Sequence, residues 1–226
     1  MHLNTVRKSA PRTASFGQGL RAGFPFAVAG FLFSFSFGVA ARPLIGPLAP
    51  IAMSTLAFAG ASQFAVLAVL ASGGGALTAI VAGGLINLRF VPMGIAVAPS
   101  LPHGLLSRTA RALAIIDTSW AIARRGEHSY DIDLMVGASV VQYVTWVAGT
   151  VTGVLLGPVL GDTQALGFDA IFPAFMLALL AGELHRPGAK AVGVLGAAIA
   201  IVLTPVAPAG VPVVSAAAAT LLELRR

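Results

Sequence analysis

Residues 76–100 read ALTAIVAGGLINLRFVPMGIAVAPS and contain a single charged side chain, Arg89. A helix rises about 1.5 Å per residue, so about 20 apolar residues cross the roughly 30 Å hydrocarbon layer of a bilayer. Similar blocks recur along the chain, and the full set is 19–41, 47–71, 76–100, 134–158, 168–184, 188–206 and 209–223. The sequence therefore predicts an all-α, polytopic helical membrane protein with about seven hydrophobic helices.

The composition agrees with a chain that resides in lipid. Of the 226 residues, 57% are hydrophobic and 10% are charged, compared with about 25% charged residues in a soluble domain. The net charge is +6, but the basic residues lie at the ends of apolar blocks. That placement indicates membrane topology and contact with anionic lipid rather than nucleic-acid binding. The absence of cysteine excludes disulfides and thiolate metal sites.

The basic residues also predict the topology. We expect residues 1–18 to form a cytoplasmic tail and residues 19–226 to form one transmembrane transport domain in a bacterial inner membrane. Simple alternation through seven blocks would place the later basic residues outside. One extra crossing by residues 105–125, or one early block that dips into the membrane and returns, moves them to the cytoplasm. We therefore predict that both termini are cytoplasmic and that one early element is polar, broken or re-entrant.

The segment 103–133 separates two possible repeat halves. Its charged residues surround an apolar centre, which fits either an interfacial amphipathic helix or a polar helix inside the bundle. On either side of it, residues 46–58 and 165–180 each open with a turn and run into an apolar helix. Internal repeats are common in secondary transporters, so an internal repeat is possible here.

The stretch FAGASQF, Phe58 to Phe64, places small residues and one full amide deep in an apolar block. Gly60, Ser62 and Gln63 fit close helix packing, with Gln63 bonded to a neighbouring helix. They also fit a locally loosened helix whose backbone and amide face a substrate path. We favour the second interpretation and place these three residues on the transport path.

Arg89 lies far from both ends of its block. An arginine at that depth costs about 2.5–3.5 kcal/mol on insertion scales unless it is paired or hydrated. It is therefore either half of a structural ion pair or a cation in the substrate path, suited to gripping a carboxylate. Asn87, two residues earlier, is expected on the other side of the helix, where it can hold a neighbouring segment or cap a break.

Asp117 and Gln142 complete the predicted site. If the helix that carries Asp117 is buried, this carboxylate is a partner for Arg89 or for a proton, and is our candidate for proton coupling. If that helix lies at the surface, Asp117 is only a solvated charge. Gln142 belongs to a polar stripe that can face the same cavity. The hypothesis is one midplane cavity at helix breaks, with Arg89 favouring the substrate carboxylate. The residues around it are Gln63, Asn87, Arg89 and Asp117.

No enzyme signature is present. The run Gly73 to Gly75 lacks the lysine that follows in a phosphate-binding loop. The histidines are scattered over termini and loops, which argues against a metal site. We expect no enzymatic activity, no cofactor and no metal.

Three segments taken together resemble the AzlC family of branched-chain amino acid transport proteins. They are RAGFPFAVAGFLFSFSFGVAA (21–41), FAGASQF (58–64) and NLRF (87–90), and the resemblance extends over about residues 17–223. It implies the large subunit of a two-component exporter of leucine, isoleucine, valine and possibly methionine. It also implies drive by the proton motive force and a small AzlD-type membrane subunit as partner.

The sequence departs from the family pattern at two positions. Phe90 stands where the family usually has histidine, and Thr118 follows Asp117 where it usually has glutamate. A proton role for those family residues therefore does not carry over to this chain. A membrane channel, a non-transporting scaffold subunit and an amino-acid importer remain alternatives to the exporter.

Overall fold

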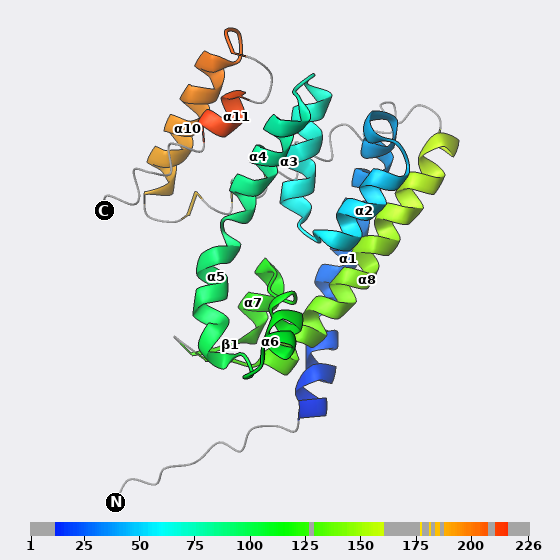
Figure 1. The fold of residues 1–226 in the computed structure, drawn as a ribbon, viewed down its shortest axis with the longest axis vertical. Coiled ribbons are helices and arrows are strands. Elements are labelled where there is room, and N and C mark those ends of the chain that lie inside the picture. Colours follow the sequence, from blue (N-terminus) through cyan, green and yellow to red (C-terminus); the bar gives the residue numbers. More distant parts are fainter. Residues whose placement is uncertain are drawn as a thin grey trace, which may run out of the picture. The chain divides into compact units, whose positions relative to one another are not determined.

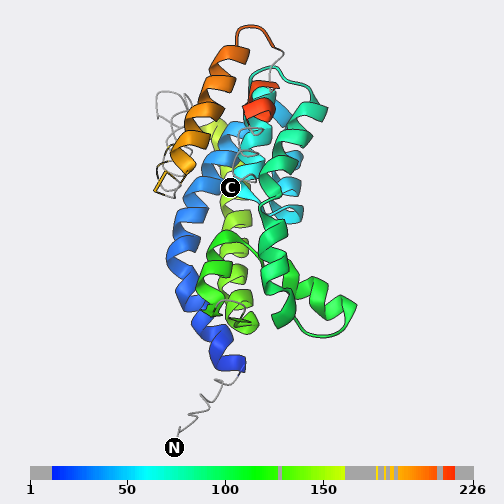
Figure 2. The same cartoon turned by 90° about the vertical axis from the view of Figure 1, so that its left-hand side faces the viewer.

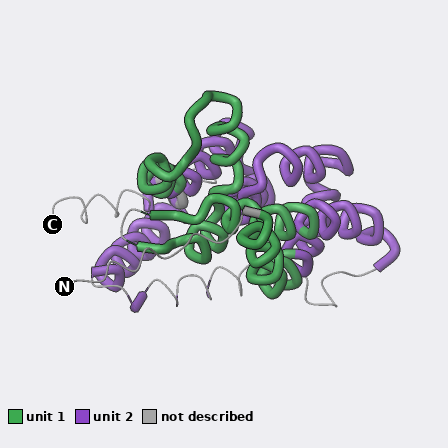
Figure 3. The backbone as a smooth tube through the Cα atoms, turned by 90° about the horizontal axis from the view of Figure 1, so that it is seen from below, with its two compact units in different colours: residues 1–30, 90–145 green, residues 31–89, 146–226 purple. Residues whose placement is uncertain are grey.

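The computed structural model describes residues 12–126, 129–160, 188–207 and 211–216, together with positions 177, 181, 184 and 185. The chain forms two compact units, coloured separately in Figure 3. Unit 1 contains residues 1–30 and 90–145, and unit 2 contains residues 31–89 and 146–226. The long helices α1 (Arg12–Ile45) and α8 (Ile132–Leu156) each contribute residues to both units.

Helices make up nearly all of the described chain (Figure 1). The strands β1 (Arg124–Gly126) and β2 (Ser129–Tyr130) pair antiparallel as a short ribbon. α1 ends where Gly46 adopts a φ of +75° and Pro47 follows, because a left-handed residue and a proline both terminate helices. The remaining elements are α2 (Leu48–Leu56), α3 (Gly60–Ala71), α4 (Ala76–Asn87), α5 (Phe90–Val97), the 3-10 turn η1 (Ala98–Ser100), α6 (Leu105–Ala112), α7 (Asp117–Ala123), β1 (Arg124–Gly126), β2 (Ser129–Tyr130), the 3-10 turn η2 (Gly157–Val159), α10 (Ala189–Leu203) and α11 (Val211–Ala216).

Three helical segments of the described chain are long and apolar enough to cross a membrane: Thr13–Ile45, Ala76–Ser100 and Ile132–Val159. The prediction of a helical membrane protein is therefore confirmed, but a count of about seven spans is not supported. α1 begins at Arg12, inside the predicted tail. The predicted blocks 168–184 and 209–223 lie largely outside the described residues, as does the second half of the possible repeat.

The predicted block 47–71 is not one continuous helix. α2 ends at Leu56 and α3 begins at Gly60. Between them Phe58 has a φ of +40°, a left-handed conformation that a bulky side chain rarely adopts. Backbone strain of this kind costs on the order of 1–3 kcal/mol and persists only where surrounding contacts hold it. This break is compatible with the polar, broken or re-entrant early element that the sequence predicts, and a return of this block to the same side of the membrane stays a prediction.

Residues 105–125 do not form the extra crossing. They contain α6 and α7, helices of 8 and 7 residues, and each is about 12 Å long or less at about 1.5 Å per residue. The turn before α7 is held by Ser119, whose hydroxyl accepts the N–H of Ile116 at 3.1 Å and donates to the carbonyl of Ala114 at 2.5 Å. The alternative of a spanning helix in this segment is therefore wrong.

α1 and α8 touch backbone to backbone and run in the same direction within each unit. In unit 1, a Cβ added to Gly19 would lie 2.2 Å from the carbonyl oxygen of Leu134, and one added to Gly23 would lie 2.6 Å from that of Ala138. Such an approach is available only to residues without a side chain. Unit 2 has contacts of the same kind, made by Gly38, Gly149 and Gly153.

Asp131 caps the N-terminus of α8. Its Oδ1 accepts the backbone N–H of Leu134 at 3.1 Å, and its Oδ2 lies 3.1 Å from Nη2 of Arg125. Partial burial raises the pKa of this carboxyl, but hydrogen bonds from Leu134, Arg125 and Ser15 outweigh the burial, so the pKa lies below its ordinary value. The folded protein therefore binds this proton more weakly than the unfolded chain does.

We expect Asp131→Ala to lower the free energy of unfolding by about 0.5–2 kcal/mol, because α8 loses its cap. Asp131→Asn is the matched control, since asparagine keeps the cap and removes the charge. A lowered folded-state pKa stabilises the fold above the unfolded-state pKa of about 4, and the effect is lost as the pH falls through the folded-state value. In detergent, the apparent melting temperature of wild type should therefore exceed that of Asp131→Asn. The difference should be largest at neutral pH and should shrink as the pH falls. A separation independent of pH would contradict the role of the charge.

Candidate functional site

Gln63 is the centre of a buried chain of hydrogen bonds in unit 2. Trp146 Nε1 donates to Gln63 Oε1 at 3.0 Å, and Gln63 Nε2 donates to Ser54 Oγ at 2.9 Å. Ser54 Oγ lies 2.7 Å from Thr150 Oγ1, and either hydroxyl can donate. Gln63 is 1% exposed, and Ser54 and Thr150 are fully buried. These bonds tie α2, α3 and α8 together around the break at Phe58.

Aromatic rings and a glycine enclose this chain of bonds. The indole of Trp146 lies against Gly60, where an added Cβ would come within 2.4 Å of the ring. The same indole meets the ring of Phe58 edge-on, with 6.4 Å between centroids. Both ends of the Gln63 amide bond to protein groups, so the structure shows the interhelical role that the sequence leaves open. A contact between this amide and a substrate stays a prediction.

We expect Gln63→Leu to lower the free energy of unfolding by about 1–3 kcal/mol, because the partly buried N–H of Trp146 loses its acceptor. Trp146→Phe removes that donor. The double variant should therefore lose less stability than the sum of the two single variants. Thermal unfolding of wild type and the three variants in detergent measures the coupling, and strict additivity would show that the bond contributes nothing.

Ser62 links α3 to α4. Its hydroxyl donates to the carbonyl of Gly83 at 3.1 Å, and a Cβ added to Gly83 would come within 2.9 Å of that hydroxyl. α3 and α4 lie side by side in unit 2 (Figure 2). Both small residues therefore serve helix packing, whatever further role they have in transport.

Asn87 and Arg89 flank the interruption between α4 and α5, which separates Asn87 from Phe90. Asn87 Oδ1 and Arg89 Nε are buried atoms, and Asn87 Oδ1 accepts no hydrogen bond from the residues that the structure describes. A buried acceptor without a partner is rare in native proteins. The interruption therefore places an open acceptor and a cation within the candidate span Ala76–Ser100.

Gln142 on α8 meets the start of α7 in unit 1. Thr118 Oγ1 donates to Gln142 Oε1 at 2.6 Å, and Gln142 Nε2 donates to the carbonyl of Ala138 at 2.9 Å. Asp117, the first residue of α7, is exposed in the described chain. Its use as a proton carrier therefore stays a prediction.

The predicted site residues fall into the two units. Asp117 and Gln142 belong to unit 1, so a single cavity that they line with the others also stays a prediction. The members in unit 2 are Gly60, Ser62, Gln63, Asn87 and Arg89.

Sequence reasoning missed the hydroxyl partners Ser54, Thr150 and Thr118. Serine and threonine are common in apolar helices, where they usually bond to the preceding turn. Thr55 does so, donating to the carbonyl of Ile51 at 2.9 Å. Nothing in the sequence distinguishes a hydroxyl of that kind from one that bonds across helices, because the difference depends on which helix lies opposite.

The fold and the site define a helical membrane protein with polar side chains buried beside interrupted helices. The chain matches the family described as AzlC protein over residues 25–160. It is 30% identical over 187 residues to the inner membrane protein YgaZ of Escherichia coli (strain K12), with 75% of each chain covered. It is 30% identical over 200 residues to an uncharacterized membrane protein of Archaeoglobus fulgidus, covering 85% of this chain and 86% of that one. No solved structure matches it. The chain belongs to the AzlC family, as the resemblance implies.

Proposed function

We propose that this chain is the large subunit of a secondary transporter that exports the branched-chain amino acids leucine, isoleucine and valine, with methionine as a further substrate. Membership of the AzlC family supports this assignment. The structural observation that carries it is the pair of buried polar atoms at the α4–α5 interruption, Asn87 Oδ1 and Arg89 Nε. Polar groups inside a membrane span are costly and mark substrate paths.

The two groups match the two ends of an amino acid. A guanidinium offers several donors in a fork that fits a carboxylate, which is the role of Arg89. The open acceptor of Asn87 fits the ammonium group, which has only donors. A zwitterion held in this way would supply the partner that the Asn87 oxygen lacks among the described residues.

The surroundings of these groups are apolar and therefore suit an aliphatic side chain. The rest of the candidate span is mostly alanine, glycine, leucine, isoleucine and valine, and it has no other charged residue. One methylene in an apolar pocket discriminates by only about 1–3 kcal/mol. We therefore expect a broad preference that covers the branched-chain amino acids rather than selection of one of them.

The proton motive force is the proposed energy source, with Asp117 as the proton-carrying residue. The complex includes a small AzlD-type membrane subunit and resides in the bacterial inner membrane with both termini of this chain in the cytoplasm. The proposal includes about seven hydrophobic helices and one polar, broken or re-entrant element, and it includes no enzymatic activity and no cofactor.

Efflux of labelled leucine from preloaded cells tests the proposal. Cells that express this chain together with the small subunit should export leucine against a gradient, and an uncoupler should abolish that export. Cells with either subunit alone should not. Downhill flux that ignores the uncoupler would indicate a channel, net uptake would indicate an importer, and Asp117→Asn with full uncoupler-sensitive export would remove Asp117 from the proton path.

A further inference from the structure

Helix α6 turns its apolar face away from the protein. Leu105 and Leu106 are each 85% exposed, and Leu113 at the end of the helix is 76% exposed. At about 100° per residue, these three side chains lie within one arc of about 100°. No residue of α6 is buried, and Figure 2 shows this helix at the edge of unit 1. In a soluble protein an apolar helix face of this kind packs on the core.

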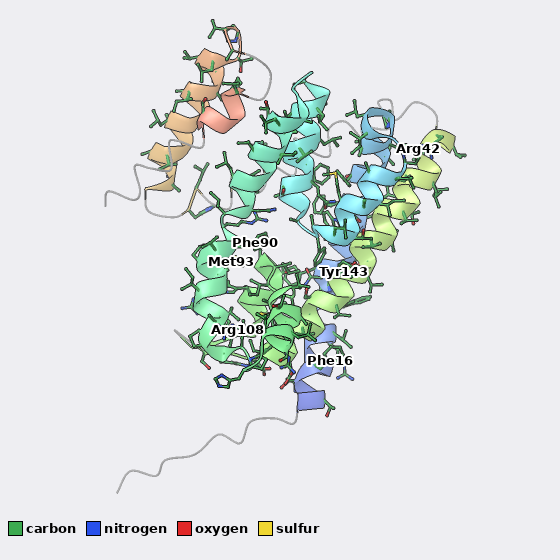
Figure 4. The ribbon with its side chains drawn as sticks, in the orientation of Figure 1. Phe16, Arg42, Phe90, Met93, Arg108 and Tyr143 are labelled. Carbon is green, nitrogen blue, oxygen red and sulfur yellow. The ribbon has the colours of Figure 1, made fainter. Side chains whose placement is uncertain are left out.

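Two arginines lie outside the leucine arc of α6. At about 100° per residue, Arg111 lies opposite the leucines, and Arg108, labelled in Figure 4, lies beside their arc, about 60° from Leu105. Arg111 Nη1 lies 3.4 Å from Asp133 Oδ1 at the start of α8. Arg111 therefore turns toward the protein, whereas Arg108 and the three leucines are exposed in the part of the chain that the structure describes. Arg124 on β1 is a further exposed cation in the same segment of unit 1.

α6 follows the end of the candidate span Ala76–Ser100. In this part of unit 1, residues at or next to the ends of the candidate spans bond to one another. The span Ala76–Ser100 ends at Ser100, whose hydroxyl accepts the N–H of Tyr130 at 3.2 Å. Asp131 immediately precedes the span that begins at Ile132, and it bonds to Ser15 at the start of the first span. Helices enter and leave a membrane at the level of the lipid headgroups, so these contacts place the neighbouring α6 at that level.

We propose that α6 is an interfacial helix that binds anionic phospholipid. Its three leucines lie among the acyl chains, and Arg108 holds a lipid phosphate, with Arg124 adding to the positive potential. Amphipathic helices with basic residues bind membranes through this combination of apolar burial and attraction to anionic lipid. A protein partner is a poorer match, because three leucine side chains offer far less than the roughly 800 Å² per partner of a specific protein interface. The proposal does not depend on what the protein transports.

The first test measures depth in the membrane. The chain contains no cysteine, so Leu106→Cys and Ser107→Cys give single labelling sites on the two faces of α6 in the full-length protein. Nitroxide labels on these variants, in nanodiscs of phosphatidylcholine and phosphatidylglycerol, report contact with oxygen in lipid or with a nickel chelate in water. The ratio of oxygen accessibility to nickel-chelate accessibility should be at least about threefold higher for the label at position 106 than for the label at position 107. Equal access of the nickel chelate to both sites would overturn the proposal, as would protection of position 106 from both reagents by a covering protein.

The second test measures lipid preference. Protein extracted from mixed vesicles should retain phosphatidylglycerol over phosphatidylcholine by several-fold, as counted by native mass spectrometry. Arg108→Gln should reduce that enrichment at least about twofold, and Arg108→Lys should keep most of it, because lysine preserves the charge. Unchanged enrichment in Arg108→Gln would overturn the headgroup assignment. An oxygen-favouring label at position 106 in the same variant shows that the helix is still folded in place.

Discussion

Replacement of Gly153 by alanine is expected to lower the free energy of unfolding by about 3 kcal/mol, the upper end of the range for overpacking substitutions. An alanine Cβ at this position would lie 2.1 Å from the carbonyl oxygen of Phe35. The obstacle is backbone rather than the end of a flexible side chain, so α1 and α8 would have to move apart in unit 2. Thr150, which lies on the same helix one turn earlier, would lose its place beside Ser54.

The matched control is Gly84→Ala in α4, because a Cβ added to Gly84 meets nothing within 4 Å. Alanine there should be neutral or stabilise the helix by up to about 1 kcal/mol. For a protein of this size, about 3 kcal/mol corresponds to a fall of roughly 6–12 °C in melting temperature. Size-exclusion chromatography after heating the detergent-solubilised protein measures that shift. Equal melting temperatures for Gly153→Ala and wild type would show that the two backbones are not in contact at this point.

Replacement of Arg89 by glutamine is expected to reduce leucine efflux at least about tenfold, with normal amounts of protein in the membrane. Hydrogen bonds to charged groups contribute about 1.5–3 kcal/mol, and 1.4 kcal/mol is a factor of ten. Arg89→Lys should retain part of the activity, because an ammonium keeps the charge but lacks the planar fork. Initial rates of labelled leucine efflux from loaded cells give the comparison.

Substrate analogues separate a binding role of Arg89 from a structural one. Wild type should be inhibited much more strongly by leucine than by 3-methylbutylamine, which is leucine without its carboxylate. Arg89→Gln should lose most of that discrimination, because the group that recognises the carboxylate is gone. Arg21→Gln, which alters an exposed arginine near the start of α1, is the control and should behave as wild type. Unchanged discrimination in Arg89→Gln would assign this arginine to structure alone.

The sequence by itself determined the class of protein and the family. A chain with 10% charged residues and several apolar blocks long enough to span lipid cannot form the charged exterior of a soluble domain. The segments around Gln63 and Arg89 stood out because an amide and a guanidinium are costly inside such blocks. The charge count predicted a polar, broken or re-entrant early element, and the structure has helix interruptions both at Phe58 and between α4 and α5.

Only the tertiary structure decided what the polar side chains bond to and where the short helices face. Counting basic residues cannot distinguish one membrane-spanning helix from two short helices. A spanning helix over residues 105–125 would balance the charges, but the structure has two short helices there. Gln63 bonds to Ser54 on α2, nine residues away across the break, and to Trp146 on α8, 83 residues away, and no local pattern encodes either bond. Hydropathy depends on the side chains in one segment, whereas hydrogen bonding depends on which segments lie side by side. For that reason, composition and the length of the apolar blocks identified the membrane class and the costly polar residues. The contacts of those residues could be found only from the folded structure.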